Sequence, residues 1–431
     1  MSEYADIKKL ETVREQNKVR EQNKAREQND SEIIYSWISD KILMGNTLEE
    51  YVKNLITPLN IFAGMVVFAG LLLILLRFIF GLDQVTEGSN EQPWSLFLGW
   101  GLFSGVPFSA SGFVIGTAVY IFNLKRYKPI VKNAILLGFL GYLFAVIFLM
   151  IDLGRPWRIY YPMFVSFGTA SVMFLVAWHV ALYLSVQFLE FSPSILAWLG
   201  QRNLRKVAVD MTLGLTIFGV MLSTLHQSAL SAMFLLAPGK LHPMWYTSYL
   251  PWLAFISAIG AALALVIVVS KLTTMFLRNR ADEHYLSSID DITLGLGKAA
   301  SLVFFTYLGF RLISVTHEGA WKYLDTPFGY WFLVEISILG IVPFLYYYGV
   351  QNKNVKLIQW TSVLTMIGII TNRLNISLIA FNWQLADREI FYWKELIVVA
   401  AVIIIEILVY RWIVNRMPVL RQHKDYMDDD H

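Results

Sequence analysis

The chain has 431 residues, of which 56% are hydrophobic and only 16% are charged, and its mean hydropathy is +0.52. These values exclude an ordinary soluble domain and indicate a protein that crosses a membrane many times. The sequence contains no cysteine, which excludes disulfides, thiol catalysis and iron–sulfur clusters held by thiolates of this chain. A net charge of +3 gives no indication of a nucleic-acid partner.

Residues 1–50 are polar and charged, and we expect no secretory signal peptide among them. Between residues 13 and 30 a hexapeptide occurs three times, as VREQNK, VREQNK and AREQND. Six residues at about 100° each do not place its apolar position on one stripe of a helix. We interpret the repeat as a solvated arm, and a docking arm for a cytoplasmic partner is the alternative.

From residue 57 onward the chain has ten apolar runs of the roughly 20 residues that a bilayer-spanning helix needs. The sequence therefore predicts an all-α polytopic membrane protein with an arm (1–50), a transmembrane domain (51–416) and a tail (417–431). The expected spans lie near 57–80, 95–122, 131–152, 162–188, 207–234, 250–277, 292–315, 329–349, 355–380 and 391–415.

Basic residues occur in every second connection between these runs, as in Lys125 to Lys132, Arg202 to Lys206 and Lys353 to Lys356. The positive-inside rule places these connections and both termini in the cytoplasm. The remaining connections face outward, among them the segment Asp152 to Arg158 and the acidic segment Asp387 to Glu389.

Several polar residues fall inside the runs and near their predicted outer ends. Intramembrane ionisable groups are costly and indicate functional sites, and an acid beside an imidazole can exchange protons near neutral pH. We therefore predict one site for a molecule that gains or loses two electrons and two protons, with Arg155 tuning the acid. Its candidate catalytic residues are Asp152, His226 and Glu335, and its candidate binding residues are Arg155, Gln227, Arg311 and Arg373.

Three further ionisable groups lie elsewhere in the runs: His179, Asp210 and Glu406. His179 is expected in the inner third of the fourth run, about 25 Å from its outer end. The three groups form a candidate proton route to the cytoplasm, and structural pairing of helices is the alternative. Because His179 and His226 are expected at different depths, we predict no bis-histidine haem, and we expect no metal site.

Separated motifs resemble a known family, the NrfD/polysulfide reductase membrane subunits, closest to its ten-helix HybB-type branch in nickel–iron hydrogenases. The motifs are GTAVYIF (116–122), DLGRPWR (152–158), STLHQS (223–228), LHPMWY (241–246) and NRLN (372–375). The similarity covers roughly residues 50–415. It implies two four-helix bundles, runs two to five and six to nine, with the first and tenth helices peripheral.

The resemblance also implies a function in the inner membrane of a bacterium or archaeon. Such a subunit binds quinone, with menaquinone expected, near the outer face and holds no haem or iron–sulfur cluster of its own. It exchanges electrons with a periplasmic iron–sulfur subunit that accompanies hydrogenase or multihaem cytochrome subunits. Asp152 and His226 occupy positions that resemble the family's quinone-site acid and histidine, while Glu335 and Arg373 match less closely.

Three other functions stay open at this point. A secondary transporter would place its acids near the midplane in paired broken helices, whereas these acids gather near one face. A haem-b cytochrome anchor and a passive membrane anchor are the other two. The residues do not decide the direction of electron flow or the side from which protons come.

Overall fold

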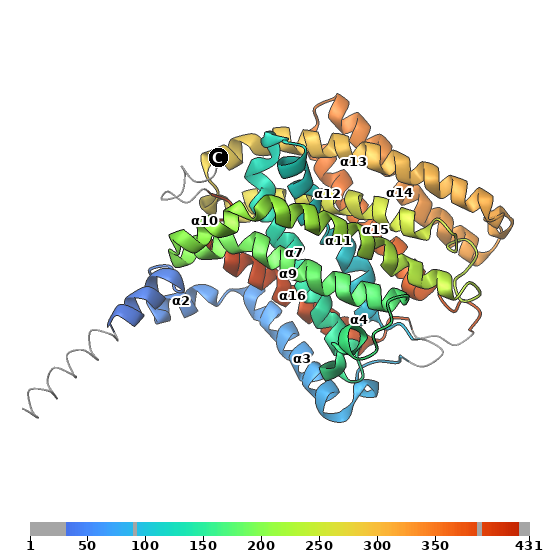
Figure 1. Ribbon diagram of the computed structural model, residues 1–431, viewed down its shortest axis with the longest axis horizontal. Coiled ribbons are helices and arrows are strands. Elements are labelled where there is room, and N and C mark those ends of the chain that lie inside the picture. Colours follow the sequence, from blue (N-terminus) through green and yellow to red (C-terminus); the bar gives the residue numbers. More distant parts are fainter. Residues whose placement is uncertain (1–31, 89–92, 386–389, 422–431) are drawn as a thin grey trace, which may run out of the picture. The chain divides into compact units, whose positions relative to one another are not determined.

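The computed structural model describes residues 32–88, 93–385 and 390–421 (Figure 1). In this part of the chain ten helical spans are long and apolar enough to cross a membrane, which confirms the all-α polytopic prediction. The hexapeptide repeat, Asp387 to Glu389 and residues 422–431 lie outside the described residues. The spans are Pro58–Phe80, Leu96–Ile121, Lys125–Asp152, Val172–Leu199, Thr212–Leu236, Leu250–Phe276, Glu283–His317, Pro327–Gln351, Val355–Ile379 and Trp393–Arg416.

Most of the spans are single helices. These are α3 (Pro58–Phe80), α7 (Lys128–Asp152), α9 (Val172–Leu199), α11 (Thr212–Ala232), α12 (Leu250–Phe276), α13 (Glu283–His317), α14 (Pro327–Gln351), α15 (Val355–Leu374) and α16 (Trp393–Arg416). The second span consists of α4 (Leu96–Leu98), η2 (Gly99–Ser104), α5 (Gly105–Phe108), α6 (Ser111–Gly116) and η3 (Thr117–Ile121). Its segments η2 and η3, like η9 (Asn375–Ile379) after α15, are π-helical, a form that often marks functional positions.

The fourth span differs most from its prediction, because α9 begins ten residues later and ends eleven residues later than expected. Its apolar start is instead a short helix, α8 (Tyr161–Phe164), followed by a loop that contains Gly168. The helix then continues through Pro193 to a left-handed residue at Gly200, where φ is 76°. Prolines are tolerated inside membrane helices, so the polar segment around Pro193 is not the end of the span.

To describe the packing within residues 63–421, we call the second span with α7, α9 and α11 the first helix group, and α12, α13, α14 and α15 the second helix group; α12 also packs against α11 and the second span. In the first group α7 packs against α6 and α9, and α11 packs against α9 and the second span. In the second group α12, α13, α14 and α15 follow one another, and α15 returns to α12. On the outside, α3 and α16 come so close that a Cβ at Gly70 would lie 2.2 Å from the Ala401 Cβ.

The second span is the most enclosed, with 72% of its apolar window buried. Its glycines allow this, because a Cβ at Gly101 would lie 2.3 Å from the Phe148 ring of α7. A Cβ at Gly112 would lie 2.5 Å from the Gln187 amide of α9. Small residues thus bring three helices of the first group into close contact.

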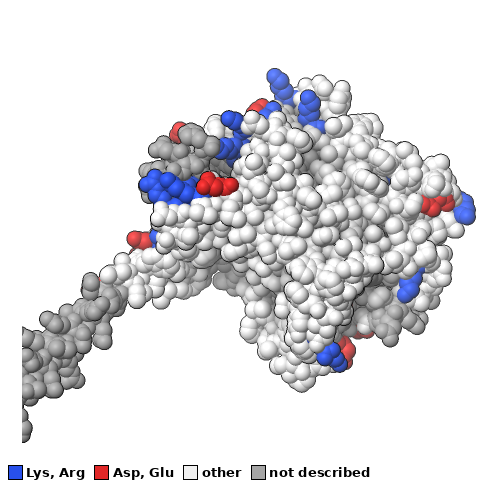
Figure 2. Space-filling view, in the orientation of Figure 1, with Lys and Arg blue, Asp and Glu red and all other residues white. Residues whose placement is uncertain are grey.

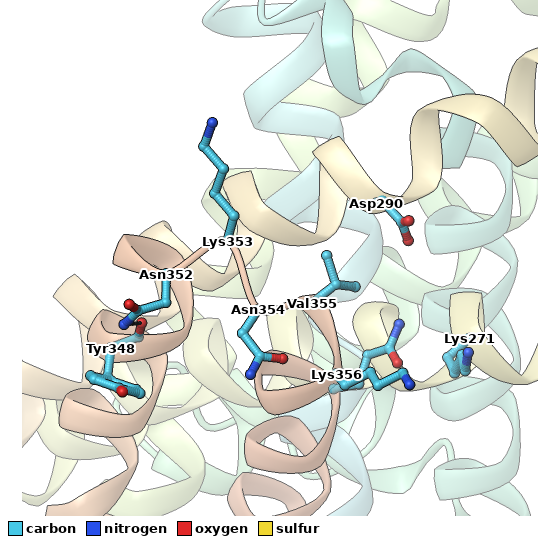
Figure 3. A pocket seen from close by; sticks show the side chains of 9 residues that line it. Lys271, Asp290, Tyr348, Asn352, Lys353, Asn354, Val355 and Lys356 are labelled. Carbon is cyan, nitrogen blue, oxygen red and sulfur yellow. Dashed lines mark hydrogen bonds between the residues drawn. The ribbon is translucent and has the colours of Figure 1, made fainter.

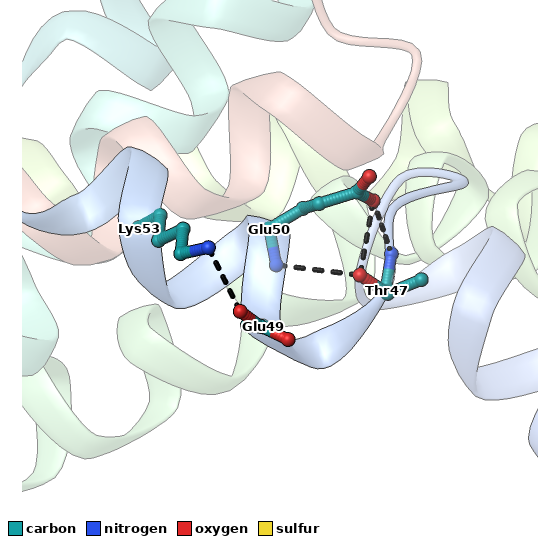
Figure 4. A network of polar contacts seen from close by, with 4 residues as sticks. All are labelled: Thr47, Glu49, Glu50 and Lys53. Carbon is teal, nitrogen blue, oxygen red and sulfur yellow. Dashed lines mark hydrogen bonds and ion pairs between the residues drawn. The ribbon is translucent and has the colours of Figure 1, made fainter.

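The described chain divides inside α3, between residues 62 and 63, into two compact units. In residues 32–62 the helix α2 (Leu48–Leu55) starts with a capping box (Figure 4). The Glu50 amide donates to the Thr47 hydroxyl at 3.3 Å, and the Thr47 amide donates to the Glu50 carboxylate at 3.0 Å. These bonds to Thr47 hold the pKa of Glu50 below its ordinary value.

Charge is scarce in the middle of one face of residues 63–421. Figure 2 shows one face on which Lys, Arg, Asp and Glu gather at the margins and leave a broad uncharged area between them. An uncharged surface of this kind suits contact with lipid. The assignment of the termini to the cytoplasm stays a prediction.

Candidate functional site

A first polar centre lies inside the first helix group, at His226 of α11. The side chain of His226 is fully buried, at 0% exposure, and its Nδ1 lies 2.7 Å from the Leu222 carbonyl oxygen. A carbonyl can only accept, so Nδ1 carries the hydrogen and Nε2 is the free acceptor in the neutral ring. The Tyr142 hydroxyl of α7 donates to that Nε2. The two helices thus hold an imidazole and a phenol as a hydrogen-bonded pair.

Gln227 orients this pair from the next position of α11. Its Nε2 donates to the Tyr142 oxygen and to the Val106 carbonyl oxygen, both at 3.0 Å. The Tyr183 ring of α9 packs on the other side, 4.7 Å from the Tyr142 ring and 5.3 Å from the His226 ring. Tyr142 therefore has fixed partners on three sides.

A second polar centre lies at the C-terminal end of α7, at Asp152. The Ser95 hydroxyl, which also caps α4, donates to the Asp152 carboxylate. The arginine beside it is Arg77 of α3, which donates to the backbone oxygens of Ile151 and Leu153. Arg155, which the sequence suggested as the tuning residue, is exposed.

Sequence reasoning missed a carboxylate close to this centre, Glu395 of α16. It is buried, and it accepts hydrogen bonds from the Thr86 hydroxyl and, at 2.7 Å, from the Leu96 amide. Glu395 thus ties the loop before the second span to the start of α16. The signal that could have revealed it was an acidic residue in the first turn of a predicted membrane span.

A third polar centre occupies the second helix group, at Glu335 of α14. Its carboxylate is 1% exposed and accepts three N–H bonds, from Trp245 at 2.7 Å, Asn372 at 2.7 Å and Asn375 at 2.5 Å. These donors come from the loop before α12, from α15 and from η9. All three partners are N–H donors, so both oxygens of the Glu335 side chain act as acceptors here.

Two buried arginines flank this centre. Arg373 of α15 donates to the Ala254 carbonyl oxygen at 3.1 Å and to the Ser257 hydroxyl at 2.7 Å. Arg311 of α13 donates to the Met244 carbonyl oxygen at 3.2 Å and lies 4.9 Å over the Phe332 ring. Arg373 also donates to the Asn372 amide oxygen at 3.4 Å. The two arginines thus connect α12 and its preceding loop to α15 and α13.

The single site expected from the sequence is therefore three centres in the structure. Tyr142 and Asp152 are ten residues apart on α7, about 15 Å along the helix axis. Among the described residues no hydrogen bond joins Asp152 to His226 or either of them to Glu335. His226 and Gln227 stay together, and Glu335 stays with Arg311 and Arg373.

The predicted proton route also changes. His179 is only seven residues from the start of α9, about 10 Å, so its placement in the inner third was wrong. Asp210 is exposed, and Glu406 is half-buried on α16 with no hydrogen bond or ion pair among the described residues. The buried acid of the first helix group is instead Glu190 of α9, which the misplaced end of the fourth run left outside the predicted membrane.

The depth argument against haem falls with the position of His179. His179 lies one turn before Tyr183, whose ring contacts His226, so the two histidines lie in the same half of the bundle. In the structure both ring nitrogens of His226 have partners, Leu222 and Tyr142.

One open pocket of about 570 Å³ lies at the other end of the second helix group (Figure 3). Lys271 of α12, Asp290 of α13 and the turn from Asn352 to Lys356 line it. It is at the end that the sequence predicts as cytoplasmic, away from Glu335. We assign it no part in the site.

Ten spans around buried, hydrogen-bonded imidazole, phenol and carboxylate groups define an integral, multi-pass membrane protein with an intramembrane polar site. The comparison with protein families gives the particular class: the model described as "Polysulphide reductase, NrfD" matches residues 84–386. The chain belongs to this NrfD family. The matched range contains the residues of all three polar centres except Arg77 and Glu395, which lie outside it.

The relatives are bacterial. A protein of Nitratidesulfovibrio vulgaris (strain Hildenborough) is 45% identical over 379 residues, 87% of this chain and 98% of its own. The "Probable Ni/Fe-hydrogenase 2 b-type cytochrome subunit" of Escherichia coli (strain K12) is 28% identical over 372 residues, 85% of this chain and 93% of its own. The "Menaquinone reductase, integral membrane subunit" of the same Nitratidesulfovibrio is 26% identical over 326 residues, 67% and 74% of the two chains. Together with the ten apolar helices, these matches identify a multi-pass protein of the bacterial inner membrane.

Proposed function

We propose that this chain is the quinone-reactive membrane subunit of a respiratory redox complex. The observation that carries the proposal is the buried pair of His226 and Tyr142, an acceptor nitrogen and a hydroxyl donor held in contact inside the membrane. Quinone reduction needs two electrons and two protons, and imidazole and phenol are groups that donate and accept protons. The printed name of the menaquinone reductase relative supports a naphthoquinone as the substrate.

The segment of α7 between Tyr142 and Asp152 suits a quinone. Residues 143–151 are all apolar, and a polar group stands at each end. A quinone ring is much shorter than the roughly 15 Å between Tyr142 and Asp152, so it contacts only one of these two ends. We place it at the His226–Tyr142 pair, which protonates one oxygen, and Asp152 exchanges protons with the other oxygen through water.

The Glu335 centre has a positioning role in this proposal. The Glu335 oxygens already accept three N–H bonds from the protein, and Arg373 and Arg311 are bound to oxygens of the protein. The centre ties α12, α14 and α15 together beside the first helix group. Its residues keep the second group in register rather than exchange protons with the substrate.

Electrons reach the quinone from a partner subunit on the predicted outer face. A chain without cysteine lacks the usual ligands of an iron–sulfur cluster, so the partner supplies the cluster. The relatives' names point to hydrogenase-type and menaquinone reductase complexes as settings for such a subunit. We propose that this chain holds no haem, and an absorbance spectrum of the purified complex, resolved by subunit, tests this directly.

The test of the function uses the complete native complex. Reduced benzyl viologen feeds electrons to the partner subunits, and a short-chain naphthoquinone is the acceptor. His226→Gln should lower the rate of naphthoquinone reduction by about 100-fold, the usual loss for a missing proton-transfer group. His284→Gln, on the exposed start of α13, is the matched control and should keep the wild-type rate.

Two further measurements complete this test. They are the amount of quinone that can be extracted from the purified complex and the subunit composition of each variant complex. A wild-type complex that holds no quinone and reduces none would refute the proposal and leave a passive anchor. Solute flux through vesicles with this chain alone would favour a transporter instead. A wild-type rate of quinone reduction in His226→Gln would show that the proton transfer takes place at another polar centre.

A further inference from the structure

The open pocket of the second helix group lies where three membrane spans end or begin (Figure 3). α12 comes to its end there, α14 ends at Gln351, and α15 begins at Val355 after a short turn. The pocket volume of about 570 Å³ falls within the roughly 300–1,000 Å³ of pockets that bind small molecules. This pocket therefore has the size of a ligand site and the position of a site at the membrane surface.

The lining of the pocket is basic. Its lysines are Lys271 of α12, Lys353 of the turn and Lys356 of α15, and its one acid is Asp290 of α13, so three lysines and one aspartate give a net charge of +2. Among the described residues no hydrogen bond or ion pair engages the ammonium groups of these lysines. Figure 3 shows the Lys356 side chain extending toward Lys271, while Lys353 points away from them. Lys271 and Lys356 are therefore the cations best placed to hold one bound group.

Neighbouring groups leave this positive charge in place. Asp291, which follows Asp290 on α13, pairs with Arg126 at 3.2 Å and does not line the pocket. Asn354 caps the start of α15 by accepting from the Leu357 amide at 3.0 Å. The N-terminal end of a helix adds positive potential. An anion with several oxygens, such as a phosphate group, suits these surroundings.

An exposed apolar surface continues from the pocket toward the middle of the membrane. On α15, Trp360 and Ile367 follow Lys356 at four and eleven residues, so they share its side of the helix, and they are 73% and 50% exposed. On α14, Phe344 lies one turn before Tyr348, which lines the pocket, and is 55% exposed. A molecule with an anionic head and apolar chains matches both parts of this surface, whereas a free phosphate matches only the first.

We infer that this pocket binds the headgroup of an anionic phospholipid such as phosphatidylglycerol, with the phosphodiester between Lys271 and Lys356. Basic pockets between membrane helices on the cytoplasmic side bind headgroups of this kind. The acyl chains lie along Phe344 and Trp360. This lipid site is independent of the quinone chemistry proposed above, because Glu335 lies at the other end of the second helix group.

The test titrates the complete complex, depleted of lipid in a mild detergent, with equal amounts of phosphatidylglycerol, phosphatidylethanolamine and phosphatidylcholine. Native mass spectrometry counts the lipids of each class that stay bound. The wild type should retain phosphatidylglycerol in preference to the two zwitterionic lipids. Lys271→Gln/Lys356→Gln should lower the affinity for phosphatidylglycerol at least about tenfold, since each lysine near an anionic lipid contributes roughly a factor of five. Lys271→Arg/Lys356→Arg keeps both charges and should retain the lipid.

A change of charge in the opposite direction separates lipid binding from a structural role of the lysines. Asp290→Asn removes the carboxylate of the pocket and should raise the affinity for phosphatidylglycerol about twofold or more, because like charges repel. Glu283→Gln neutralises an acid at the exposed start of α13, outside the pocket, and should leave the affinity unchanged. A loss of packing would lower lipid retention in every pocket variant and would not raise it in Asp290→Asn.

A matched control for the double lysine variant is Lys53→Gln/Lys125→Gln. It removes two exposed lysines outside the pocket, on the side that the sequence predicts as cytoplasmic, and should leave the affinity unchanged. If Lys271→Gln/Lys356→Gln does not assemble, the single variant Lys356→Gln should still lower the affinity about threefold or more.

Three results would overturn the lipid site. They are equal affinity for phosphatidylglycerol in the wild type and in Lys271→Gln/Lys356→Gln, equal retention of the three lipid classes by the wild type, and a lower affinity in Asp290→Asn. Thermal melts of the lipid-depleted complex distinguish the source of the phosphate. Phosphatidylglycerol should raise the Tm of the wild type more than that of the double variant, and an equal rise with inorganic phosphate alone would assign the pocket to a soluble anion instead.

Discussion

Tyr142 of α7 donates its hydroxyl hydrogen to Nε2 of His226 of α11, inside the first helix group. The Leu222 carbonyl fixes the tautomer of the ring, and Gln227 fixes the tyrosine. The pair is therefore set up in one protonation state, with the donor and the acceptor already chosen. This relationship gives the first prediction.

Tyr142→Phe keeps the ring and its packing against Tyr183 but removes the hydroxyl. We expect the rate of naphthoquinone reduction to fall by about 10- to 100-fold, since a positioned proton donor contributes on that order. Steady-state rates with the complete complex measure this. Tyr347→Phe, on an exposed face of α14, is the control, and equal rates in the two variants would contradict the role of the pair.

Asp152→Asn tests the proton exchange proposed for the outer end of α7. Asparagine still accepts from Ser95 but cannot exchange a proton, so we expect at least about tenfold slower quinone reduction while the partner subunits stay bound. Asp83→Asn, on the exposed connection before the second span, should leave the rate unchanged. Loss of the partner subunits in Asp152→Asn would instead assign Asp152 to docking.

Gly329→Ala tests packing at the start of α14. An added Cβ would lie 2.2 Å and 2.3 Å from the backbone oxygens of Tyr323 and Leu324, which cannot swing away as a side chain can. We expect a loss of about 1–3 kcal/mol in the free energy of unfolding, typical of overpacking. Gly309→Ala meets no atom within 4 Å and should be neutral or stabilising in a thermal melt in detergent.

His242 gives a pH-dependent prediction outside the membrane spans. Its ring is 2% exposed, accepts from the Met244 amide at 3.1 Å and lies 4.7 Å from the rings of both Phe328 and Trp383. Burial among these uncharged rings lowers the pKa of His242 from 6.5 to about 4. Between these two values the unfolded chain binds a proton that the folded chain does not, so the folded state loses stability as the pH falls.

The expected loss between pH 7 and pH 5 is at most about 2 kcal/mol. Thermal melts at both values should show a lower Tm at pH 5, and His242→Phe should reduce the difference. The exposed His284→Gln should keep it. A difference that is the same in wild type and His242→Phe would show that other groups cause it.

The position of the fourth span shows where sequence reasoning reached its limit. Apolar residues before Val172 extended the predicted run, and the polar residues around Pro193 ended it too early. A ten-residue displacement is three helical turns, which moved His179 from the outer half to the inner third and placed Glu190 outside the membrane. Hydropathy sums over a window, so it finds a span but does not place individual residues in depth.

Composition and hydrophobic run length by themselves determined the ten spans, because a helix that crosses lipid has to be apolar over its whole length. The family followed from separated motifs, which were confirmed by the match over residues 84–386. Only the tertiary structure divided the polar residues among three centres and joined Glu190 to Thr216 and Tyr142 to His226. The physical reason is that these contacts depend on the rotation and depth of each helix, which packing between helices decides and the period of an almost uniformly apolar sequence does not reveal.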